Sequence, residues 1–353
     1  MRIALVTDAW TPQINGVVTT LVRLVSGLRA RGHEVDVIEP GAFTTVPCPS
    51  YPEIPLSLDL HQVWRRLRGA AIQRLHISTE GPLGLAARAW ARVNGVPFTT
   101  SLHTRFPDYF DIRVPGTRSV GMAYLRWFHK PSRAVLVPSR SMRDSLQAEG
   151  FRHLRLWTRG FDAGLFSPAH RDPSLLPGKP HLLCVSRLAP EKNLEAFCAL
   201  GDRFICTLVG DGPDRPRLEA QYPRVRYLGF QQGVALARLY ASADVFVFPS
   251  RTDTFGVVML EAMASGTPVV GYPVTGPMDV IEPGLNGWLG EDLSALIEPA
   301  LTLDRKRVRA SAERWSWDEC VDLFEAQTPY QTDKILSRRR RGTSLLPRPS
   351  LSR

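Results

Sequence analysis

Short apolar runs alternate with helical patterns along most of the chain. In the first half, the runs that have the length and composition of buried strands lie at 2–6, 35–38, 75–77, 98–101 and 134–137. Apolar residues recur at helical spacing at 17–31, 83–93, 120–128 and 140–149. Such alternation is typical of βαβ units, so the first half is predicted to form a parallel sheet covered by helices.

A cluster of prolines separates this half from a second alternating region. Pro168, Pro173, Pro177 and Pro180 interrupt every periodic pattern, which predicts a domain boundary near residue 170. Beyond it, strands are predicted at 181–185, 205–209, 225–228 and 245–248, and helices at 194–200, 215–221, 234–241 and from 257 onward. The predicted fold is α/β, with two doubly wound, Rossmann-like domains at 1–170 and 171–330 that face an interdomain cleft at the carboxyl ends of their sheets.

Three segments depart from the alternating pattern. Five prolines between 40 and 55 predict an extended loop with little regular structure. A last helix at about 316–330 can pack back on the first domain, and the basic tail 334–353 is predicted to be disordered. The first apolar run breaks at Thr7-Asp8, too early for a signal peptide, and no apolar segment approaches the length that spans a bilayer.

The net charge of +10 is distributed unevenly. Residues 1–170 hold 21 Lys/Arg against 12 Asp/Glu, residues 171–333 hold 16 against 22, and the tail from 334 holds 7 basic residues and no acid. The acidic second half argues against a nucleic-acid partner. A basic first half and tail suit an anionic membrane surface, although arginines that simply solvate helices would give the same asymmetry.

The sequence shows no sign of a metal site or a resident cofactor. No Asp-x-Asp triplet follows a strand, and no His or Cys residues have the spacing of metal ligands. The five cysteines, which include no Cys-x-x-Cys pair, are expected to be buried thiols in a reducing cytoplasm.

Two carboxylates lie eight positions apart across a predicted strand-to-helix junction. Asp253 lies on the loop that follows the strand ending at Phe248, where open α/β sheets bind ligands. Glu261 lies about two turns along the next helix. One carboxylate could contact a sugar while the other contacts a ribose; the alternative is a capping Asp followed by an unrelated surface Glu.

Two cations and a glycine turn lie at other strand ends. Arg187 and Lys192 follow the first strand of the second domain, where they could bind the same phosphate group, unless they are only a solvated pair. Asn15-Gly16 could let backbone amides approach an anion near a helix start, or be only a turn. The missing G-x-G-x-x-G fingerprint counts against a dinucleotide-dependent oxidoreductase.

Two polar side chains follow strands of the first domain. His103 is placed where an imidazole could hydrogen-bond a sugar hydroxyl or a leaving oxygen, although a lone His is usually structural. Glu80 occupies a similar strand end and could contact an acceptor.

Taken in order, these pieces resemble the retaining glycosyltransferases of family 4. The matching pieces are Asn15-Gly16-Val17, His103, Ser186-Arg187-Leu188 with Glu191-Lys192, Gly210-Asp211-Gly212-Pro213 and Asp253-x7-Glu261. The resemblance covers roughly residues 1–330 and implies the GT-B fold. The stretches 79–84, 101–106 and 124–129 look most like bacterial members that glycosylate membrane lipids such as diacylglycerol.

The resemblance implies a role for each matching position. A nucleotide-sugar donor would contact Arg187 and Lys192 through its pyrophosphate and Glu261 through its ribose hydroxyls. The other donor-binding positions would be Gly16, Asp253, Phe255, Gly256 and Val257, and the acceptor side would include Glu80, His103 and Arg105. The catalytic residues implied are Asp253, His103, Arg187 and Lys192. Most members have Glu at the position of Asp253, so this side chain is shorter by about 1.5 Å, one carbon–carbon bond.

The resulting prediction is a retaining hexosyltransferase that moves a hexose from a UDP- or GDP-sugar to a membrane lipid, without a metal. It would work in the cytoplasm, peripherally on the inner face of the cytoplasmic membrane. One alternative is a GDP-mannose-dependent α-mannosyltransferase that acts on another glycolipid or glycan. Others are a nucleotide-sugar epimerase or sugar phosphorylase of the same fold, and a non-catalytic binder of nucleotide sugars.

Overall fold

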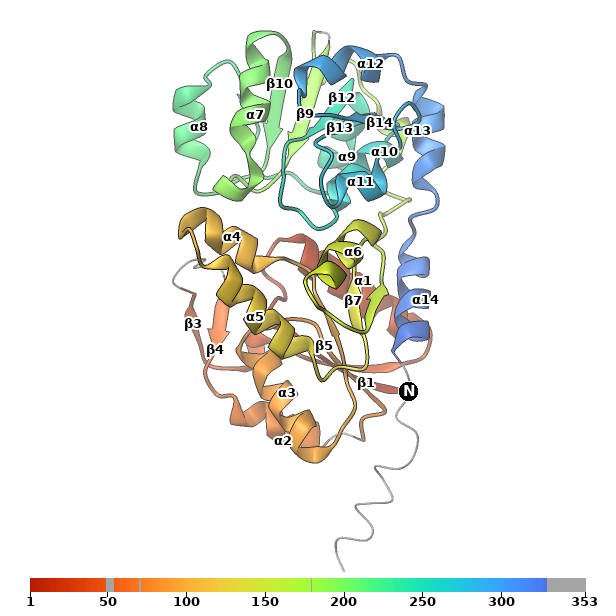
Figure 1. The fold of residues 1–353 in the computed structure, drawn as a ribbon. Helices are drawn as coiled ribbons and strands as arrows, with labels where there is room; N and C mark the ends of the chain where they lie inside the picture. The colour runs from red at the N-terminus through yellow and green to blue at the C-terminus, as the bar shows by residue number, and fades with distance from the viewer. Residues whose placement is uncertain (49–53, 70, 179, 329–353) are drawn as a thin grey trace, which may run out of the picture.

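The computed structural model of the chain describes residues 1–48, 54–69, 71–178 and 180–328, which form two α/β halves (Figure 1). The first sheet has the strand order β2-β1-β5-β6-β7-β8 and the second the order β11-β10-β9-β12-β13-β14, and all pairs within them are parallel. The strand order reverses beside β1 in the first sheet and beside β9 in the second. The predicted α/β class with two Rossmann-like domains is confirmed.

The strands of the two sheets are short and mostly buried. In the first sheet they are β1 (Arg2–Val6), β2 (Glu34–Ile38), β5 (Arg74–Ile77), β6 (Thr99–Ser101), β7 (Val135–Val137) and β8 (Leu154–Leu156). In the second they are β9 (His181–Val185), β10 (Ile205–Val209), β11 (Arg226–Tyr227), β12 (Val245–Phe248), β13 (Val269–Gly271) and β14 (Gly287–Leu289). Helices cover both faces, which explains why central strands such as β12 are apolar at every position rather than at every second one.

Six helices belong to the first half and eight follow it in the described chain. The first six are α1 (Gly16–Ala30), α2 (His61–Gly69), α3 (Pro82–Asn94), α4 (Phe106–Arg113), α5 (Arg118–His129) and α6 (Arg140–Ala148). The others are α7 (Leu194–Cys198), α8 (Arg215–Gln221), α9 (Gly233–Ser242), α10 (Val257–Ala264), α11 (Pro277–Val280), α12 (Ile297–Leu301), α13 (Arg305–Ala312) and α14 (Trp317–Gln327). None of the described helices is long and apolar enough to cross a membrane.

The sequence pattern missed several short elements. The proline-rich loop contains a small antiparallel pair, β3 (Thr45–Pro47) with β4 (Pro55–Ser57), and the tip between them lies outside the described residues. Strands β8, β13 and β14 were also not predicted. The predicted basic tail at 334–353 also lies outside the described residues.

The last helix, α14, packs on the first half of the chain rather than on the second (Figure 1). The Arg31 guanidinium donates hydrogen bonds of 2.5 Å to Asp322 and Glu325, and the Trp157 indole donates one of 2.9 Å to the Cys320 carbonyl. Phe324 is fully buried in the same cluster. The chain therefore passes between the two halves twice, once after Trp157 and once before α14.

Candidate active site

The loops at the carboxyl ends of β9 and β12 bring two of the predicted site residues into direct contact. Lys192 Nζ lies 2.5 Å from Asp253 Oδ1, and the two side chains are only 18% and 19% exposed. Although burial opposes the charge on Lys192, its pKa is raised because the Asp253 carboxylate and the Tyr109 oxygen lie beside it. The ammonium group is therefore charged at neutral pH.

Hydrogen bonds between these loops fix Asp253 relative to Lys192. The Thr252 hydroxyl donates to the Glu191 carbonyl at 3.1 Å, and the Asn193 side-chain amide donates to the Pro249 carbonyl at 3.0 Å. Asn193 itself has a φ of 52°, which turns the chain sharply after Lys192. The ion pair therefore rests on backbone that is held at several points.

Glu261 lies on α10, the helix that follows the Asp253 loop. Its Oε2 accepts a hydrogen bond of 2.9 Å from the hydroxyl of Tyr240, which is fully buried on α9. Burial raises the pKa of Glu261 to about 7, and the Tyr240 hydrogen bond opposes that rise. A carboxyl group with this pKa is partly ionised at neutral pH and can accept hydrogen bonds from the hydroxyls of a ligand.

The turn into α10 depends on Gly256. Its φ is 87°, a left-handed conformation that L side chains rarely adopt, and an added Cβ would lie 2.7 Å from Met259 and 2.9 Å from the Phe248 ring. Phe255 is buried against Trp315 at a ring-centroid distance of 5.4 Å, and Val257 is the first residue of the helix. The predicted donor-binding positions 255–257 thus form the strand-to-helix turn between Asp253 and Glu261.

His103, on the first half, is buried beneath the junction of the two halves. Arg159 donates to its Nδ1 at 3.1 Å, so the neutral ring carries its proton on Nε2, which faces the Ser101 hydroxyl at 2.8 Å. Burial, with the Arg159 charge beside it, lowers the pKa of His103 well below its usual value. The His103 carbonyl accepts a 2.5 Å hydrogen bond from Thr254 of the second half. Both ring nitrogens are occupied within the protein, and the backbone of His103 contacts the Asp253 loop.

Tyr109, which the sequence analysis did not single out, reaches the same carboxylate from the first half. Its hydroxyl lies 3.4 Å from Asp253 Oδ1, the oxygen that Lys192 also contacts. Tyr109 sits on α4 with 9% of its surface exposed. The motif that contains His103 extends to Tyr109, but an isolated Tyr on a short helix has no pattern that would identify it as a site residue.

The remaining predicted residues make contacts of other kinds. The Glu80 carboxylate lies 3.1 Å from His129 Nε2, and Arg105 pairs with Asp108 and Glu149 at 2.8 and 2.6 Å. The charge of Arg105 is therefore compensated within the first half, and the Glu80 carboxylate is hydrogen-bonded there.

Two predicted donor positions lie in strand-end loops. Gly16 is the first residue of α1, whose start is capped by the Asn15 side chain. Arg187 is partly exposed in the Lys192 loop.

A second contact between the halves lies beside this site. Asp279 on α11 accepts hydrogen bonds from the backbone amides of Arg140 and Ser141 at 2.9 and 3.0 Å, and from the Ser141 hydroxyl. An aspartate from one half thus caps α6 of the other half. This cap and the Thr254–His103 bond hold the two halves together at the carboxyl ends of their sheets.

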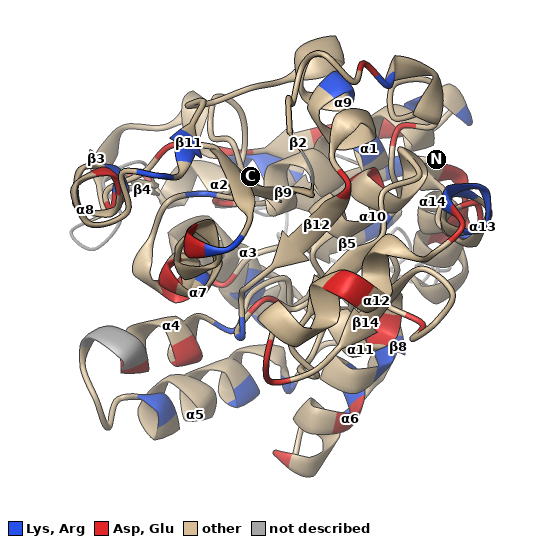
Figure 2. Ribbon diagram, turned by 90° about the horizontal axis from the view of Figure 1, so that it is seen from above, with Lys and Arg blue, Asp and Glu red and all other residues tan. Residues whose placement is uncertain are grey.

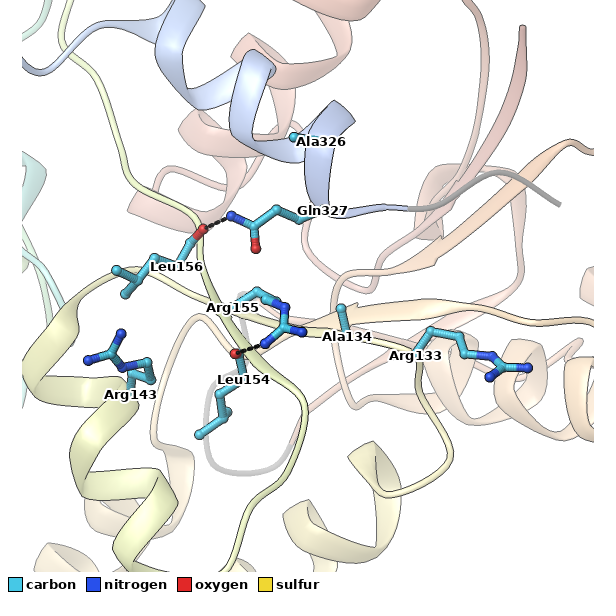
Figure 3. Close-up of a pocket in the computed structure, with 8 residues that line it drawn as sticks. All are labelled: Arg133, Ala134, Arg143, Leu154, Arg155, Leu156, Ala326 and Gln327. Carbon is cyan, nitrogen blue, oxygen red and sulfur yellow. Dashed lines mark hydrogen bonds between the residues drawn. The ribbon is translucent and has the colours of Figure 1, made fainter.

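Two surface hollows of about 500 and 430 Å³ lie elsewhere, on the first half. The larger one lies beside β8, and its three arginines, Arg133, Arg143 and Arg155, point in different directions rather than toward one ligand position (Figure 3). Neither hollow is lined by Lys192 or Asp253. The chemistry of the buried contacts at the domain junction, rather than the size of a hollow, defines the candidate site.

Two facing Rossmann-like domains, with Lys192 and Asp253 paired at the strand ends of the second one, have the architecture of a GT-B glycosyltransferase. Residues 14–165 match the family model described as Glycosyltransferase Family 4, and residues 179–304 match the one described as Glycosyl transferases group 1. The chain belongs to glycosyltransferase family 4.

Named relatives and solved structures agree with this assignment. The chain is 33% identical to a GDP-mannose-dependent alpha-mannosyltransferase of Mycobacterium tuberculosis, over 92% of this chain and 97% of the relative. It is 27% identical to the alpha-monoglucosyldiacylglycerol synthase of Acholeplasma laidlawii, over 76% and 80% of the two chains. Anabaena HepE in complex with UDP and glucose has the same fold, with a TM-score of 0.71 at 18% identity over 92% of this chain and 98% of that one.

Proposed function

We propose that this glycosyltransferase moves a hexosyl group from a nucleotide sugar to a membrane lipid and retains the configuration at the anomeric carbon. The observation that carries the proposal is the largely buried Lys192–Asp253 pair at the strand ends of the second half. Glu261 lies on α10, the helix that follows the Asp253 loop. A cation, a carboxylate beside it and a second carboxylate about one turn into α10 would match the diphosphate, the hexose and the ribose of the donor.

The hard step is the departure of the nucleoside diphosphate from an anomeric carbon that gains positive character. Lys192 would stabilise the negative charge that develops on the leaving phosphate, with Arg187 in the same loop as a second cation. We propose that these protein cations make a divalent metal unnecessary. Glu261 would accept hydrogen bonds from the ribose hydroxyls, which positions the donor without taking part in bond breaking.

Asp253 would act next to the transferred hexose. In the free protein both Lys192 and Tyr109 contact its Oδ1. A donor diphosphate competes for the ammonium group of Lys192, so donor binding would loosen this pair and release the carboxylate toward the sugar hydroxyls. His103 would contribute through its backbone contact with the Asp253 loop and through the shape of the neighbouring wall, since its ring nitrogens are already bonded.

The identity of the donor and acceptor is a finer proposal. Three relatives at 30–33% identity are named GDP-mannose-dependent alpha-mannosyltransferases, and these matches cover 90–92% of this chain, so GDP-mannose is the first donor to test. Relatives named as a sulfoquinovosyl transferase and as monoglucosyldiacylglycerol synthases support a lipid acceptor. The predicted location on the inner face of a membrane follows from such an acceptor.

The test is an assay of the purified full chain with GDP-mannose, UDP-glucose, UDP-galactose and UDP-glucuronate, each with vesicles that contain diacylglycerol and bacterial glycolipids. The expected result is a new glycolipid with the α-configuration of the donor, made from one donor class. Glu261→Ala should abolish it, whereas Glu298→Ala, an exposed substitution on α12, should not.

Other outcomes would point to the alternatives. Conversion of the donor in the absence of any acceptor would indicate an epimerase, and dependence on inorganic phosphate would indicate a phosphorylase. Donor binding without transfer to any lipid or sugar would support a non-catalytic binder.

A further inference from the structure

Helices α4 and α5 carry a concentration of exposed apolar side chains. Five large apolar residues are exposed within 18 positions: Phe110 (39%), Val114 (56%), Val120 (74%), Tyr124 (36%) and Trp127 (51%). Single exposed apolar residues are ordinary on a protein surface, but a cluster of them marks a surface that contacts something apolar.

Three of these residues share one face of α5. Val120, Tyr124 and Trp127 follow the spacing i, i+4, i+7, which places them in one line along a helix. We refer to these three residues as the α5 stripe. The opposite face of α5 is buried through Met122, Leu125 and Phe128, so the helix cannot rotate to bury the stripe instead.

Interactions behind the helix hold the stripe in place. The buried Arg88 side chain lies 3.8 Å from the centre of the Trp127 ring and donates hydrogen bonds to the Trp127 and Phe128 carbonyls at 2.8 and 2.9 Å. Tyr124 lies 5.9 Å from Trp127, ring centre to ring centre. The half-exposed indole is therefore held on the protein side by the Arg88 guanidinium.

The stretch of sequence that contains the stripe carries basic residues only. Residues 112–143 contain Arg113, Arg118, Arg126, Lys130, Arg133, Arg140 and Arg143, and no Asp or Glu. Arg118 is paired with Asp108 and Glu149, which lie outside this stretch. Figure 2 shows α4 and α5 at the periphery of the molecule, with basic positions along α5. Tryptophan and tyrosine flanked by basic residues are the composition that binds the interface of an anionic bilayer.

The stripe also connects to the predicted acceptor side. The Tyr124 hydroxyl donates a hydrogen bond to the backbone carbonyl of Glu80, and His129, at the end of the same helix, contacts the Glu80 carboxylate. A lipid that enters the bilayer-facing side of α5 would therefore lie next to the residue predicted to contact the acceptor.

From these observations we infer that the α5 stripe is the surface by which this chain docks on an anionic membrane. Val120 and Trp127 enter the interfacial region of the bilayer, and the basic residues of α5, Arg118 and Arg126, contact lipid phosphates. The inference rests on the proposed lipid acceptor for its biological meaning, but docking itself can be measured without any reaction.

The test is co-sedimentation of the full chain with vesicles of phosphatidylcholine, with and without phosphatidylglycerol. The wild type should bind the anionic vesicles. Val120→Glu combined with Trp127→Glu should lower the partition coefficient at least about tenfold, because it removes apolar contact and adds like charge to the lipid. The basic tail is identical in all variants, and raised salt weakens its attraction to the vesicles. The difference in binding between the wild type and the stripe variant should therefore be largest at raised salt.

A matched control is available in the same domain. Val93 at the end of α3 is 73% exposed, against 74% for Val120, but lies outside the stripe. Val93→Glu should bind vesicles as the wild type does. If Val93→Glu loses as much binding as the stripe variant, if the stripe variant binds normally, or if the wild type binds neither kind of vesicle, the inference is overturned.

Two further measurements separate this inference from its rivals. If the wild type forms a dimer without lipid and the stripe variant does not, the stripe is a contact between copies and the membrane assignment is wrong. Transfer to acceptor dispersed in detergent should be retained by the stripe variant. Membrane docking without transfer to any lipid would overturn the proposed function but not the docking inference. Full transfer by the stripe variant in vesicles would overturn the docking inference but not the proposed function.

Discussion

The raised pKa of Glu261 predicts how the folding stability of the protein changes with pH. The ordinary pKa of a Glu is 4.5, and burial raises the pKa of Glu261 to about 7 in the folded protein. Between these two values the folded chain binds more protons than the unfolded chain, so folding stability falls as the pH rises through this window. Above about pH 7 the full cost of keeping a buried carboxylate is present.

Replacing Glu261 with Gln removes this cost while keeping an oxygen that can accept the Tyr240 hydrogen bond. The pKa difference corresponds to roughly 3 kcal/mol, which is an upper limit because Glu261 is only partly buried. Glu261→Gln should therefore be more stable than the wild type at pH 8, by up to about 3 kcal/mol. Well below pH 4.5 the carboxyl group is protonated in both states, and the difference should nearly vanish.

The assay is urea unfolding at pH 5, 6, 7 and 8, followed by tryptophan fluorescence and far-UV circular dichroism, together with donor affinity from calorimetry at pH 8. Glu298→Gln, an exposed substitution, is the control and should leave stability unchanged at every pH. We expect Glu261→Gln to gain stability and to lose donor affinity. A gain that is the same at pH 5 and pH 8, or a variant less stable than the wild type at pH 8, would refute the reasoning.

Three other predictions follow from the contacts at the site. Tyr240→Phe removes the hydrogen bond that lowers the Glu261 pKa. The pH at which donor binding, measured by calorimetry, is half-maximal should therefore rise by about one unit. An unchanged pH profile would mean that this bond does not affect the Glu261 pKa. Lys192→Ala should lower kcat/KM at least about 100-fold in a transfer assay, because the cation proposed to stabilise the leaving phosphate is lost. The wild type should keep its rate in excess chelator, and loss of turnover in chelator would contradict a metal-free mechanism. Asp279→Ala removes the cap that joins the two halves and should weaken the contact between them by about 1 kcal/mol. We expect a larger radius of gyration in X-ray scattering, and an unchanged radius would contradict a role of this cap in holding the halves together.

The sequence by itself determined the architecture and where three of the predicted site residues lie. Apolar runs of strand length alternated with helical patterns on both sides of the proline cluster near 170, and this is sufficient to predict two Rossmann-like domains because each strand must be covered on both faces. The positions of Lys192, Asp253 and Glu261 could also be read from the chain, since each follows a recognisable strand and the carboxyl ends of parallel strands meet at one edge. The side chains of a strand-end loop are consecutive in sequence, so they can be identified without the structure.

Only the tertiary structure decided which side chains already have partners within the protein and which site residues are distant in sequence. Nothing in the sequence indicates that Arg159, 56 positions from His103, fixes its ring, or that Tyr109 reaches Asp253 across 144 positions. Arg105 likewise pairs with Glu149, which lies 44 positions away and which no spacing rule could pair with it. These outcomes depend on burial and on contacts between separate elements, and both are properties of the packed chain because a side chain's solvent and neighbours are set by segments that are distant in sequence.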